Sequence, residues 1–211
     1  MFVGKDMTQN LITITSEKLL TEAAELLKKY RIHHLPVVQG EKLIGIITDT
    51  DIRNAVVNNK HDNEPESITL SSIKVSDVMV TNLVTITPED FLEDALLILS
   101  EKRFGALPVV EDEKLVGIIT KADILKAFIK ILGVENIGVR LQISIPDNLS
   151  KYDELLHLLK KLDVEIISII LSPPINNNRF VFLRISSINT LKIKEMLEEK
   201  GFKIVKLSDF L

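Results

Sequence analysis

Cysteine and tryptophan are absent from this 211-residue chain, and only 5% of its residues are aromatic. Without cysteine there is no disulfide, no thiolate ligand for a metal and no thiol nucleophile. A hydrophobic core must therefore be built mainly from Ile, Leu and Val. The first residues show no signal-peptide pattern, and no apolar run reaches the roughly 20 residues of a membrane-spanning helix. We expect a soluble, cytoplasmic protein.

The chain also lacks a large excess of charge of one sign. Its 26 Lys and Arg residues stand against 30 Asp and Glu residues, which gives a net charge of −4. Proteins that bind nucleic acid or anionic membranes commonly carry a strongly basic patch or segment. We therefore expect neither nucleic acid nor a membrane as a partner.

One stretch of the sequence is present twice. Met7–Ile52 and Met79–Ile124 align without a gap at an offset of 72 residues. Each copy contains a Leu-Pro-Val-Val strand, a polar turn and a second apolar strand that ends in Gly-Ile-Ile-Thr-x-x-Asp. Agreement of this extent indicates a duplicated structural unit.

Each copy predicts the order strand, helix, strand, strand, helix. Short strands at Leu11–Ile14 and Leu83–Ile86 precede helices whose apolar residues recur at helical spacing. The last helices are predicted over Asp51–Val57 and Ala122–Leu132. The polar, turn-rich segment 58–67 reads as an exposed linker.

After Gly133 the pattern changes to strand, helix, strand, strand, helix, strand. Such an order in about seventy residues is typical of a ferredoxin-like α+β sandwich. The fold class is therefore α+β throughout, with two βαββα units followed by one βαββαβ domain. The predicted boundaries are 1–57 for the first unit, 58–73 for the linker, 74–133 for the second unit and 137–211 for the last domain.

The repeated units resemble CBS motifs, through the Leu-Pro-Val-Val strand and above all through Gly-Ile-Ile-Thr-x-x-Asp. Two copies in tandem resemble a Bateman module, and the last domain resembles an ACT domain in its pattern. The complete order resembles the acetoin utilization protein B family. This resemblance implies a regulatory ligand that contains adenosine, such as AMP, ADP, ATP or S-adenosylmethionine, in the cleft between the CBS motifs.

Asp51 and Asp123 end the two matching motifs, where a strand passes into a helix. A carboxylate accepts hydrogen bonds from adjacent ribose hydroxyls, and the resemblance implies this role for both residues. Thr48 and Thr120 lie three residues earlier and offer a hydroxyl, while the helix start favours an anion. The alternative is that Thr and Asp only cap the following helix. The residues implied to bind ribose and phosphate are Thr48, Thr50, Asp51, Thr120, Lys121 and Asp123.

The two copies differ where contacts to phosphate are expected. The first copy has His33, His34 and Arg53 as candidates, whereas the second has Gly105-Ala106 in place of the histidines. Phosphates at one site therefore depend, on this interpretation, on cations of the other copy. The candidates for the adenine pocket are apolar residues of the strands, namely Leu11, Ile12, Pro36, Leu83, Val84 and Pro108.

Alternatives to ligand binding by the histidines are metal chelation and packing. Adjacent residues on a strand point to opposite faces, which argues against joint chelation by His33 and His34. His61 and His157 are expected to be solvated. No nucleophile-elbow, phosphate-loop or dinucleotide fingerprint is present. We therefore expect neither a metal site nor an enzyme.

The leading hypothesis is a non-enzymatic regulatory protein that senses an adenosine-containing ligand and is linked to acetoin or related carbon metabolism. A homodimer with an unidentified protein partner is expected, because CBS pairs and ACT domains commonly assemble. One alternative is a dimeric scaffold with empty clefts. Another is an amino-acid sensor through the last domain, although its loop 145–150 lacks the glycine common in ACT domains.

Overall fold

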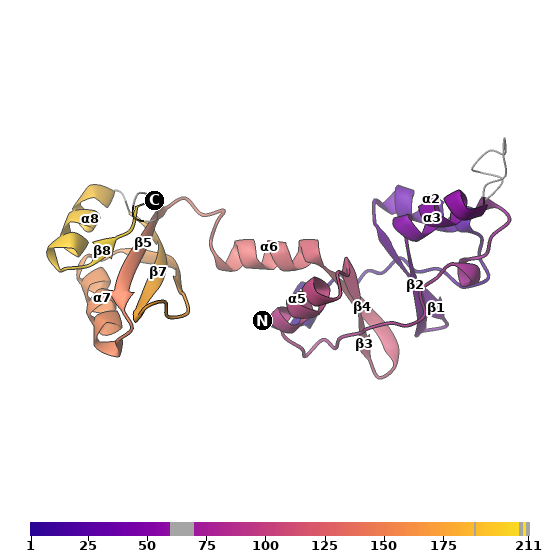
Figure 1. Ribbon diagram of the computed structural model, residues 1–211, viewed down its shortest axis with the longest axis horizontal. Coiled ribbons are helices and arrows are strands. Elements are labelled where there is room, and N and C mark those ends of the chain that lie inside the picture. The colour runs from indigo at the N-terminus through magenta and orange to yellow at the C-terminus, as the bar shows by residue number, and fades with distance from the viewer. Residues whose placement is uncertain (60–69, 188, 207–208, 210–211) are drawn as a thin grey trace. The chain divides into compact units, whose positions relative to one another are not determined.

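The fold was analysed in a computed structural model, which describes residues 1–59, 70–187, 189–206 and 209. The chain divides into two compact units, Met1–Leu125 and Lys126–Leu211 (Figure 1). Both units contain helices and strands, which confirms the α+β class. Residues 60–69 of the predicted linker, including His61, lie outside the described residues.

The first unit is built from two hairpins, each followed by a helix. The hairpins join β1 (His34–Gln39) to β2 (Lys42–Thr48) and β3 (Ala106–Glu111) to β4 (Lys114–Thr120). Its helices and helical turns are α1 (Val3–Asp6), α2 (Leu20–Tyr30), α3 (Asp49–Asn59), η1 (Val75–Asp77), α5 (Leu92–Glu101) and α6 (Lys121–Ile131), the last of which continues into the second unit.

The four strands form one antiparallel sheet in the order β1-β2-β4-β3. The two central strands pair at a single position, Lys42 opposite Lys114. Like charges directly opposite each other are unfavourable, and both lysines are compensated. Lys42 Nζ lies 2.9 Å from Glu113 Oε2, and Lys114 Nζ lies 2.6 Å from Glu41 Oε2.

The predicted first strand of each copy is reduced to one bridge. Ile14 pairs in parallel with Val37, and Ile86 pairs in the same way with Val109. In a parallel ladder the next bond toward residue 12 would come from the N–H of residue 36. That residue is Pro36, which has no N–H, and Pro108 has the same position in the second copy. The expectation of strands at Leu11–Ile14 and Leu83–Ile86 was therefore wrong.

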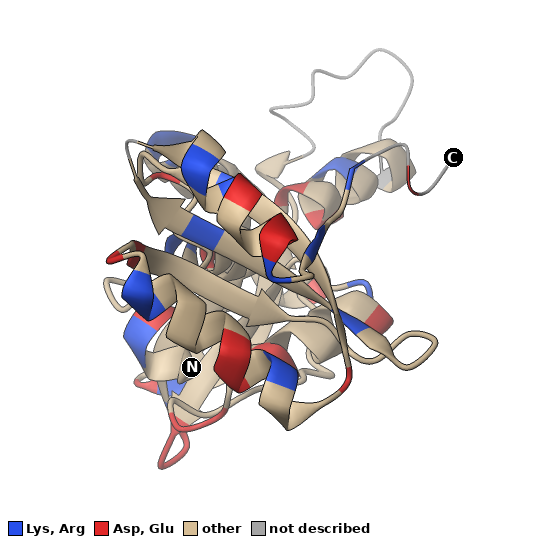
Figure 2. Ribbon diagram, turned by 90° about the vertical axis from the view of Figure 1, so that its left-hand side faces the viewer, with Lys and Arg blue, Asp and Glu red and all other residues tan. Residues whose placement is uncertain are grey.

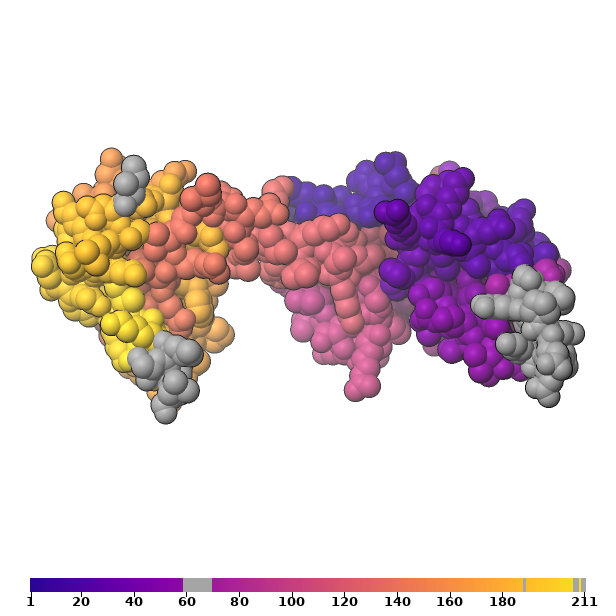
Figure 3. All heavy atoms as spheres, turned by 90° about the horizontal axis from the view of Figure 1, so that it is seen from above, coloured from indigo at the N-terminus to yellow at the C-terminus, as the bar shows by residue number. Residues whose placement is uncertain are grey.

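The two copies exchange the segments that precede them. The N–H groups of Val3 and Gly4 donate to the carbonyls of Asp90 and Pro88. In the reciprocal contact, the N–H groups of Val75 and Ser76 donate to the carbonyls of Lys18 and Ser16. Residues 1–8 thus complete the second copy, and residues 73–80 complete the first. The indigo N-terminal residues lie against the second copy in Figure 3.

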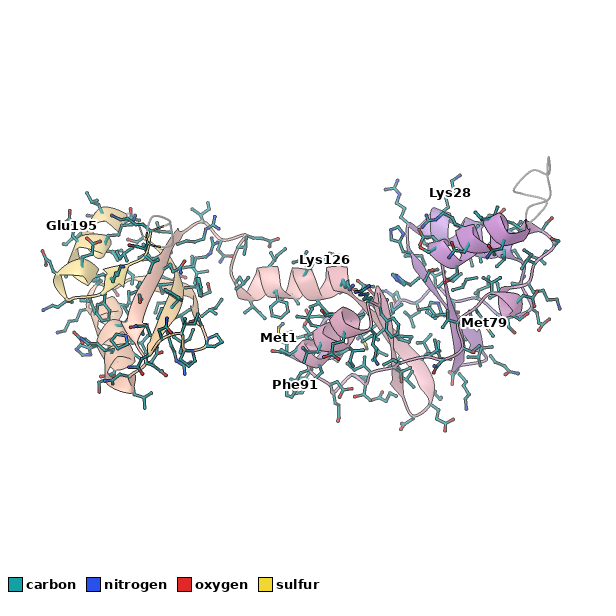
Figure 4. All side chains as sticks on the ribbon, in the orientation of Figure 1. Met1, Lys28, Met79, Phe91, Lys126 and Glu195 are labelled. Carbon is teal, nitrogen blue, oxygen red and sulfur yellow. The ribbon has the colours of Figure 1, made fainter. Side chains whose placement is uncertain are left out.

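The exchange continues into the sheet. Thr8 forms a bridge with Ile118 of β4, and Val80 forms a bridge with Ile46 of β2. Beside these bridges, the Met7 side chain lies against Gly117 and the Met79 side chain against Gly45. Figure 4 shows Met79 beside β2 and Met1 near Phe91.

Burial in the first unit repeats with the sequence. Leu20, Leu35 and Ile47 of the first copy are completely buried. Their equivalents 72 residues later are Leu92, Leu107 and Ile119, and these are buried to the same degree. Each copy therefore has its own aliphatic core, as the near absence of aromatic residues requires.

The second unit has the order β5 (Val139–Pro146), α7 (Leu149–Lys161), β6 (Glu165–Leu171), β7 (Asn178–Ser186), α8 (Thr190–Glu199) and β8 (Lys203–Ile204). Its strands form an antiparallel sheet in the order β6-β7-β5-β8. This is the predicted βαββαβ order and the ferredoxin-like arrangement. Lys, Arg, Asp and Glu positions are intermixed on the helices that face the viewer in Figure 2.

Helix α5 offers a direct test of where the second copy's core lies. Leu99 has 0% of its surface exposed, whereas Leu97 on the same helix is 58% exposed. We expect Leu99→Ala to lower the free energy of unfolding by about 2–5 kcal/mol, because it leaves a cavity. Leu97→Ala should change it by no more than about 0.5 kcal/mol. Urea denaturation measures both, and equal losses would contradict the assigned core.

Candidate ligand-binding cleft between the two repeats

A cleft with a volume of about 360 Å³ lies between the two copies in the first unit. One side is formed by the end of β2 and the start of α3, including Thr48 and Asp51. The other side is formed by the second copy, which contributes Leu83, Val84 and Pro108. Three of the six adenine-pocket candidates thus lie opposite the predicted ribose ligand. A volume of this size suits a small molecule.

The side chains of Thr48 and Asp51 hold each other at the start of α3. Asp51 Oδ2 accepts hydrogen bonds from Thr48 Oγ1 at 2.6 Å and from the Thr48 N–H at 2.9 Å. The Asp51 N–H donates in turn to Thr48 Oγ1 at 3.2 Å. The capping role is therefore real, and it uses one carboxylate oxygen. Among the described residues, Oδ1 has no donor, so it keeps its capacity to accept from ribose hydroxyls.

The second copy repeats this arrangement. Asp123 Oδ2 accepts from Thr120 Oγ1 at 2.7 Å and from the Thr120 N–H at 3.0 Å. In both copies the hydroxyl hydrogen of the threonine is already donated to the aspartate. Each threonine therefore positions its carboxylate, and a bond from its hydroxyl to a phosphate would require this internal bond to break.

The phosphate candidates of the first copy gather around Asp49. Arg53 Nη1 lies 3.2 Å from Asp49 Oδ2, and Arg53 Nη2 donates to Thr50 Oγ1 at 3.0 Å. His33 Nδ1 lies 3.5 Å from the same Asp49 oxygen. His33, Asp49 and Thr50 line the cleft, whereas Arg53 does not. The charge of Arg53 is thus directed to Asp49 rather than into the cleft.

His34 crosses to the other copy. Its imidazole lies against the Cα of Gly105, where a side-chain carbon would collide with the ring. Burial, and secondly the charge of His33, lower the pKa of His34 below its usual value of 6.5, although Asp49 and Asp51 act in the opposite direction. The Gly105-Ala106 pair of the second copy therefore provides the space that the His34 ring occupies.

Arg103 is a residue of the cleft that the sequence reasoning missed. It lines the cleft from the second copy and has a left-handed backbone with φ of 57°. Its equivalent Arg31 has φ of 53°. The available signal was a basic residue shortly before each Leu-Pro-Val-Val strand. Arg103 places a cation of the second copy in the cleft that Asp51 lines, and its contact with phosphate stays a prediction.

The remaining site candidates do not line this cleft. They are Leu11, Ile12, Pro36, Thr120, Lys121 and Asp123. The bridge between Thr8 and Ile118 repeats the one between Val80 and Ile46. Because Val80 and Ile46 line the first cleft, we expect the remaining candidates around the equivalent bridge of Thr8 with Ile118; a second site there stays a prediction.

The described residues contain no cluster of three or more His, Cys, Asp or Glu side chains that could hold a metal ion. His157 is exposed on α7 of the second unit. No helix in the described part of the chain is both long enough and apolar enough to cross a membrane.

Comparison with known families agrees with this architecture. The CBS domain profile matches residues 3–58 and 75–130, which together make up more than half of the chain. The chain belongs to the CBS-domain family. Both CBS matches lie almost entirely within the first unit and include both Thr-x-x-Asp turns.

Several curated proteins are similar over the CBS pair. The chain is 32% identical over 122 residues to the CBS domain-containing protein YhcV of Bacillus subtilis, covering 58% of this chain and 81% of that protein. It is 36% identical over 120 residues to inosine-5'-monophosphate dehydrogenase of Methanocaldococcus jannaschii. That match covers 56% of this chain but only 22% of the enzyme.

Solved structures show the same CBS fold. The CBS pair of protein MJ0100, in complex with 5'-methylthioadenosine and S-adenosyl-L-methionine, is 31% identical with a TM-score of 0.53 and covers 61% of this chain and 99% of that one. CBSX2 in complex with AMP is 29% identical with a TM-score of 0.54, covering 62% and 97%. A putative acetoin utilization protein of Vibrio cholerae is 28% identical with a TM-score of 0.55, covering 64% and 95%.

The lowered pKa of His34 predicts a pH dependence of stability. Well above pH 6.5 the imidazole is neutral in both the folded and the unfolded chain. Below it the unfolded chain binds a proton that the folded chain resists, so this contribution to stability is lost as the pH falls. We expect the wild type to lose more free energy of unfolding than His34→Gln between pH 7.5 and pH 5.5, as measured by urea denaturation.

His157→Gln is the control for this measurement, because His157 is exposed and lies in the other unit. Comparison of the two variants isolates the effect of position 34 from that of a His-to-Gln change elsewhere. A parallel pH profile for His34→Gln would show that His34 does not titrate differently in the folded chain.

Proposed function

We propose that this CBS pair is a regulatory module that binds adenosine-containing ligands without catalysing a reaction. The observation that carries the proposal is Asp51 Oδ1, which has no donor among the described residues. Asp51 lines a cleft whose other side includes the apolar Leu83, Val84 and Pro108. The carboxylate is held in place by Thr48 before any ligand arrives, so little ordering is needed on binding. Leu83, Val84 and Pro108 offer an apolar surface for the adenine ring.

Two solved relatives support the proposal, because each was solved with ligands that contain adenosine. The MJ0100 pair binds 5'-methylthioadenosine and S-adenosyl-L-methionine, and CBSX2 binds AMP. Both proteins match this chain over the CBS pair and at about 30% identity. Adenosine is the chemical group that these ligands share.

The two positions differ in charge, and we propose that they differ in ligand. At the first position, the two negative charges of Asp49 and Asp51 equal in number the two positive charges of Arg53 and Arg103. At the second, Lys121 replaces Asp49, and Arg31 is the equivalent of Arg103. An excess of positive charge favours phosphate. The first position suits an adenosyl ligand with little negative charge, and the second suits an adenine nucleotide.

A ligand in the first cleft would contact both copies, which are linked by their exchanged segments. It would therefore favour one relative placement of the copies, to the extent that it binds that placement more tightly. We propose that this shift is the regulatory signal. The link to acetoin or related carbon metabolism is proposed from the Vibrio cholerae neighbour, and the dimer and the cytoplasmic location remain proposals from the sequence.

For the last domain we retain the ACT-like assignment as a proposal, but its first loop offers little to an amino acid. Asp147 Oδ1 lies 2.6 Å from Arg179 Nε, and Asn148 Oδ1 accepts from the Ser150 N–H at 2.8 Å. The side chains of Asp147 and Asn148 are thus engaged within the protein. The structure gives the amino-acid sensor at this loop less support than the nucleotide sensor in the CBS pair.

Substitution of both aspartates tests the sensor. A ligand at 100 times its dissociation constant should stabilise the wild type by about 2.7 kcal/mol. We expect Asp51→Ala with Asp123→Ala to abolish this gain for AMP, ATP, 5'-methylthioadenosine and S-adenosylmethionine, because the ribose loses its acceptor. Thermal unfolding and calorimetry measure the effect. An unchanged gain would favour the scaffold with empty clefts.

Asp90→Ala is a control that separates ligand binding from the loss of local Thr–Asp hydrogen bonds. Asp90 Oδ2 accepts from Thr87 Oγ1 at 2.8 Å and from the Thr87 N–H at 2.7 Å, the same local pattern as at Asp51. It does not line the cleft. Asp90→Ala should lose about 1 kcal/mol of stability through its lost hydrogen bonds, while its response to ligand is unchanged.

Charge reversal tests the difference between the two positions. We expect Lys121→Glu to weaken ADP binding about tenfold, which corresponds to about 1.4 kcal/mol, and to leave 5'-methylthioadenosine binding unchanged. Asp49→Asn should strengthen ADP binding at the first position. Calorimetry resolves both, and an equal effect of Lys121→Glu on the two ligands would contradict the assignment.

A further inference from the structure

The second unit contains a separate cavity of about 420 Å³. It lies on the face of the sheet opposite α7 and α8. Leu141 and Leu183 point toward the helices and join their core. Because successive residues of a strand point to opposite faces, Arg140, Gln142 and Phe182 lie on the other face, and all three line the cavity.

The segment that follows α6 closes part of this face. Ser168 Oγ donates to the carbonyl of Leu132 at 2.9 Å, and Arg184 Nη1 donates to the carbonyl of Asn136 at 3.1 Å. Leu132 and Val134 also line the cavity. The cavity therefore has a sheet floor, a partial cover and a mainly apolar lining.

Arg184 is the only charged residue that is buried in the described part of the chain, with 6% of its surface exposed. It lines the cavity, and its bond to Asn136 uses one of five N–H donors. The other donors have no partner among the described residues. A buried guanidinium with unused donors is costly unless an acceptor is supplied.

Arg140 increases this cost. It lies directly opposite Arg184 in the pairing of β5 with β7. Like charges at such positions repel each other. No described Asp or Glu forms an ion pair with either arginine. The two guanidinium groups thus form a site of positive charge that lacks a counter-charge.

We propose that this cavity binds a small carboxylate with an apolar body. Guanidinium groups match the planar geometry of a carboxylate and bind it through paired hydrogen bonds. Gln142 and Ser168 add polar groups, and Ile170 and Phe182 face the rest of the ligand. This site is distinct from the loop considered for an amino acid and does not depend on the CBS clefts.

The lining also selects against amino acids. It contains two arginines and no Asp or Glu, so an ammonium group would meet charges of its own sign. A 2-oxo acid has the same carbon skeleton without that group. The ligand class is therefore an apolar monocarboxylate such as a branched-chain or aromatic 2-oxo acid.

Calorimetry on the full chain with 4-methyl-2-oxopentanoate, leucine and inorganic phosphate tests the proposal. The oxo acid should bind at least tenfold more tightly than either of the others. Failure of the oxo acid and of phenylpyruvate to bind at 10 mM would overturn the proposal. Tighter binding of leucine would overturn the ligand class in favour of an amino acid, and tighter binding of phosphate would do so in favour of an inorganic anion.

Two variants locate the binding. Arg140→Gln, at an exposed position, should weaken oxo-acid binding at least tenfold and raise the unfolding temperature of the free protein, because the repulsion is removed. Arg184→Lys keeps the positive charge but loses the paired N–H donors of the guanidinium, and it should also weaken oxo-acid binding. Lys192→Gln is the control, because this exposed residue on α8 makes the same change of charge away from the cavity. Oxo-acid binding that survives both arginine substitutions would place the ligand elsewhere.

Discussion

The exchange of segments between the two repeats is the constraint on which the rest of the CBS pair depends. Residues 1–8 are bonded into the second copy and residues 73–80 into the first. The central strands of the sheet pair at one position only, so the exchanged segments supply most of the backbone bonds that join the halves. The cleft between the copies exists because each exchanged segment runs on past the partner's β2 or β4.

The Thr-x-x-Asp turn combines two roles that sequence reasoning had set against each other. One aspartate oxygen caps the helix and the other has no partner among the described residues. The cap fixes the carboxylate beside the cleft, so under the proposed function one side chain would serve both stability and recognition. The same arrangement at Asp123 shows that it is a property of the local sequence rather than of one site.

The two units place charge differently. In the CBS pair the Arg53 guanidinium near Asp51 is compensated, since it lies close to Asp49. In the second unit Arg140 and Arg184 lie opposite each other without a described acid beside them. Charges that are paired within the protein form a preorganised surface. Unpaired positive charges beside a cavity instead favour the binding of an anionic ligand.

The sequence by itself determined the duplication, the aliphatic cores, the βαββαβ order of the tail and the Thr-x-x-Asp turns. These features depend on periodicity and on hydrogen bonds between residues three or four positions apart. Both can be recognised in the sequence without knowledge of the fold. The prediction of full strands at Leu11–Ile14 and Leu83–Ile86 was wrong. Pro36 and Pro108 lie in the partner strands, and their missing N–H groups prevent these segments from pairing further. Loss of an N–H matters only once the pairing is known.

Only the tertiary structure shows which residues of each copy line the cleft. Two repeats with matching patterns are equivalent along the chain, so nothing local says that Leu83 and Arg103 line the same cleft as Asp51. The same holds for Arg140 and Arg184, which are 44 residues apart in sequence and become neighbours only through strand pairing. Long-range contacts of this kind are set by the packing of whole elements, and both candidate ligand sites of this protein consist of such contacts.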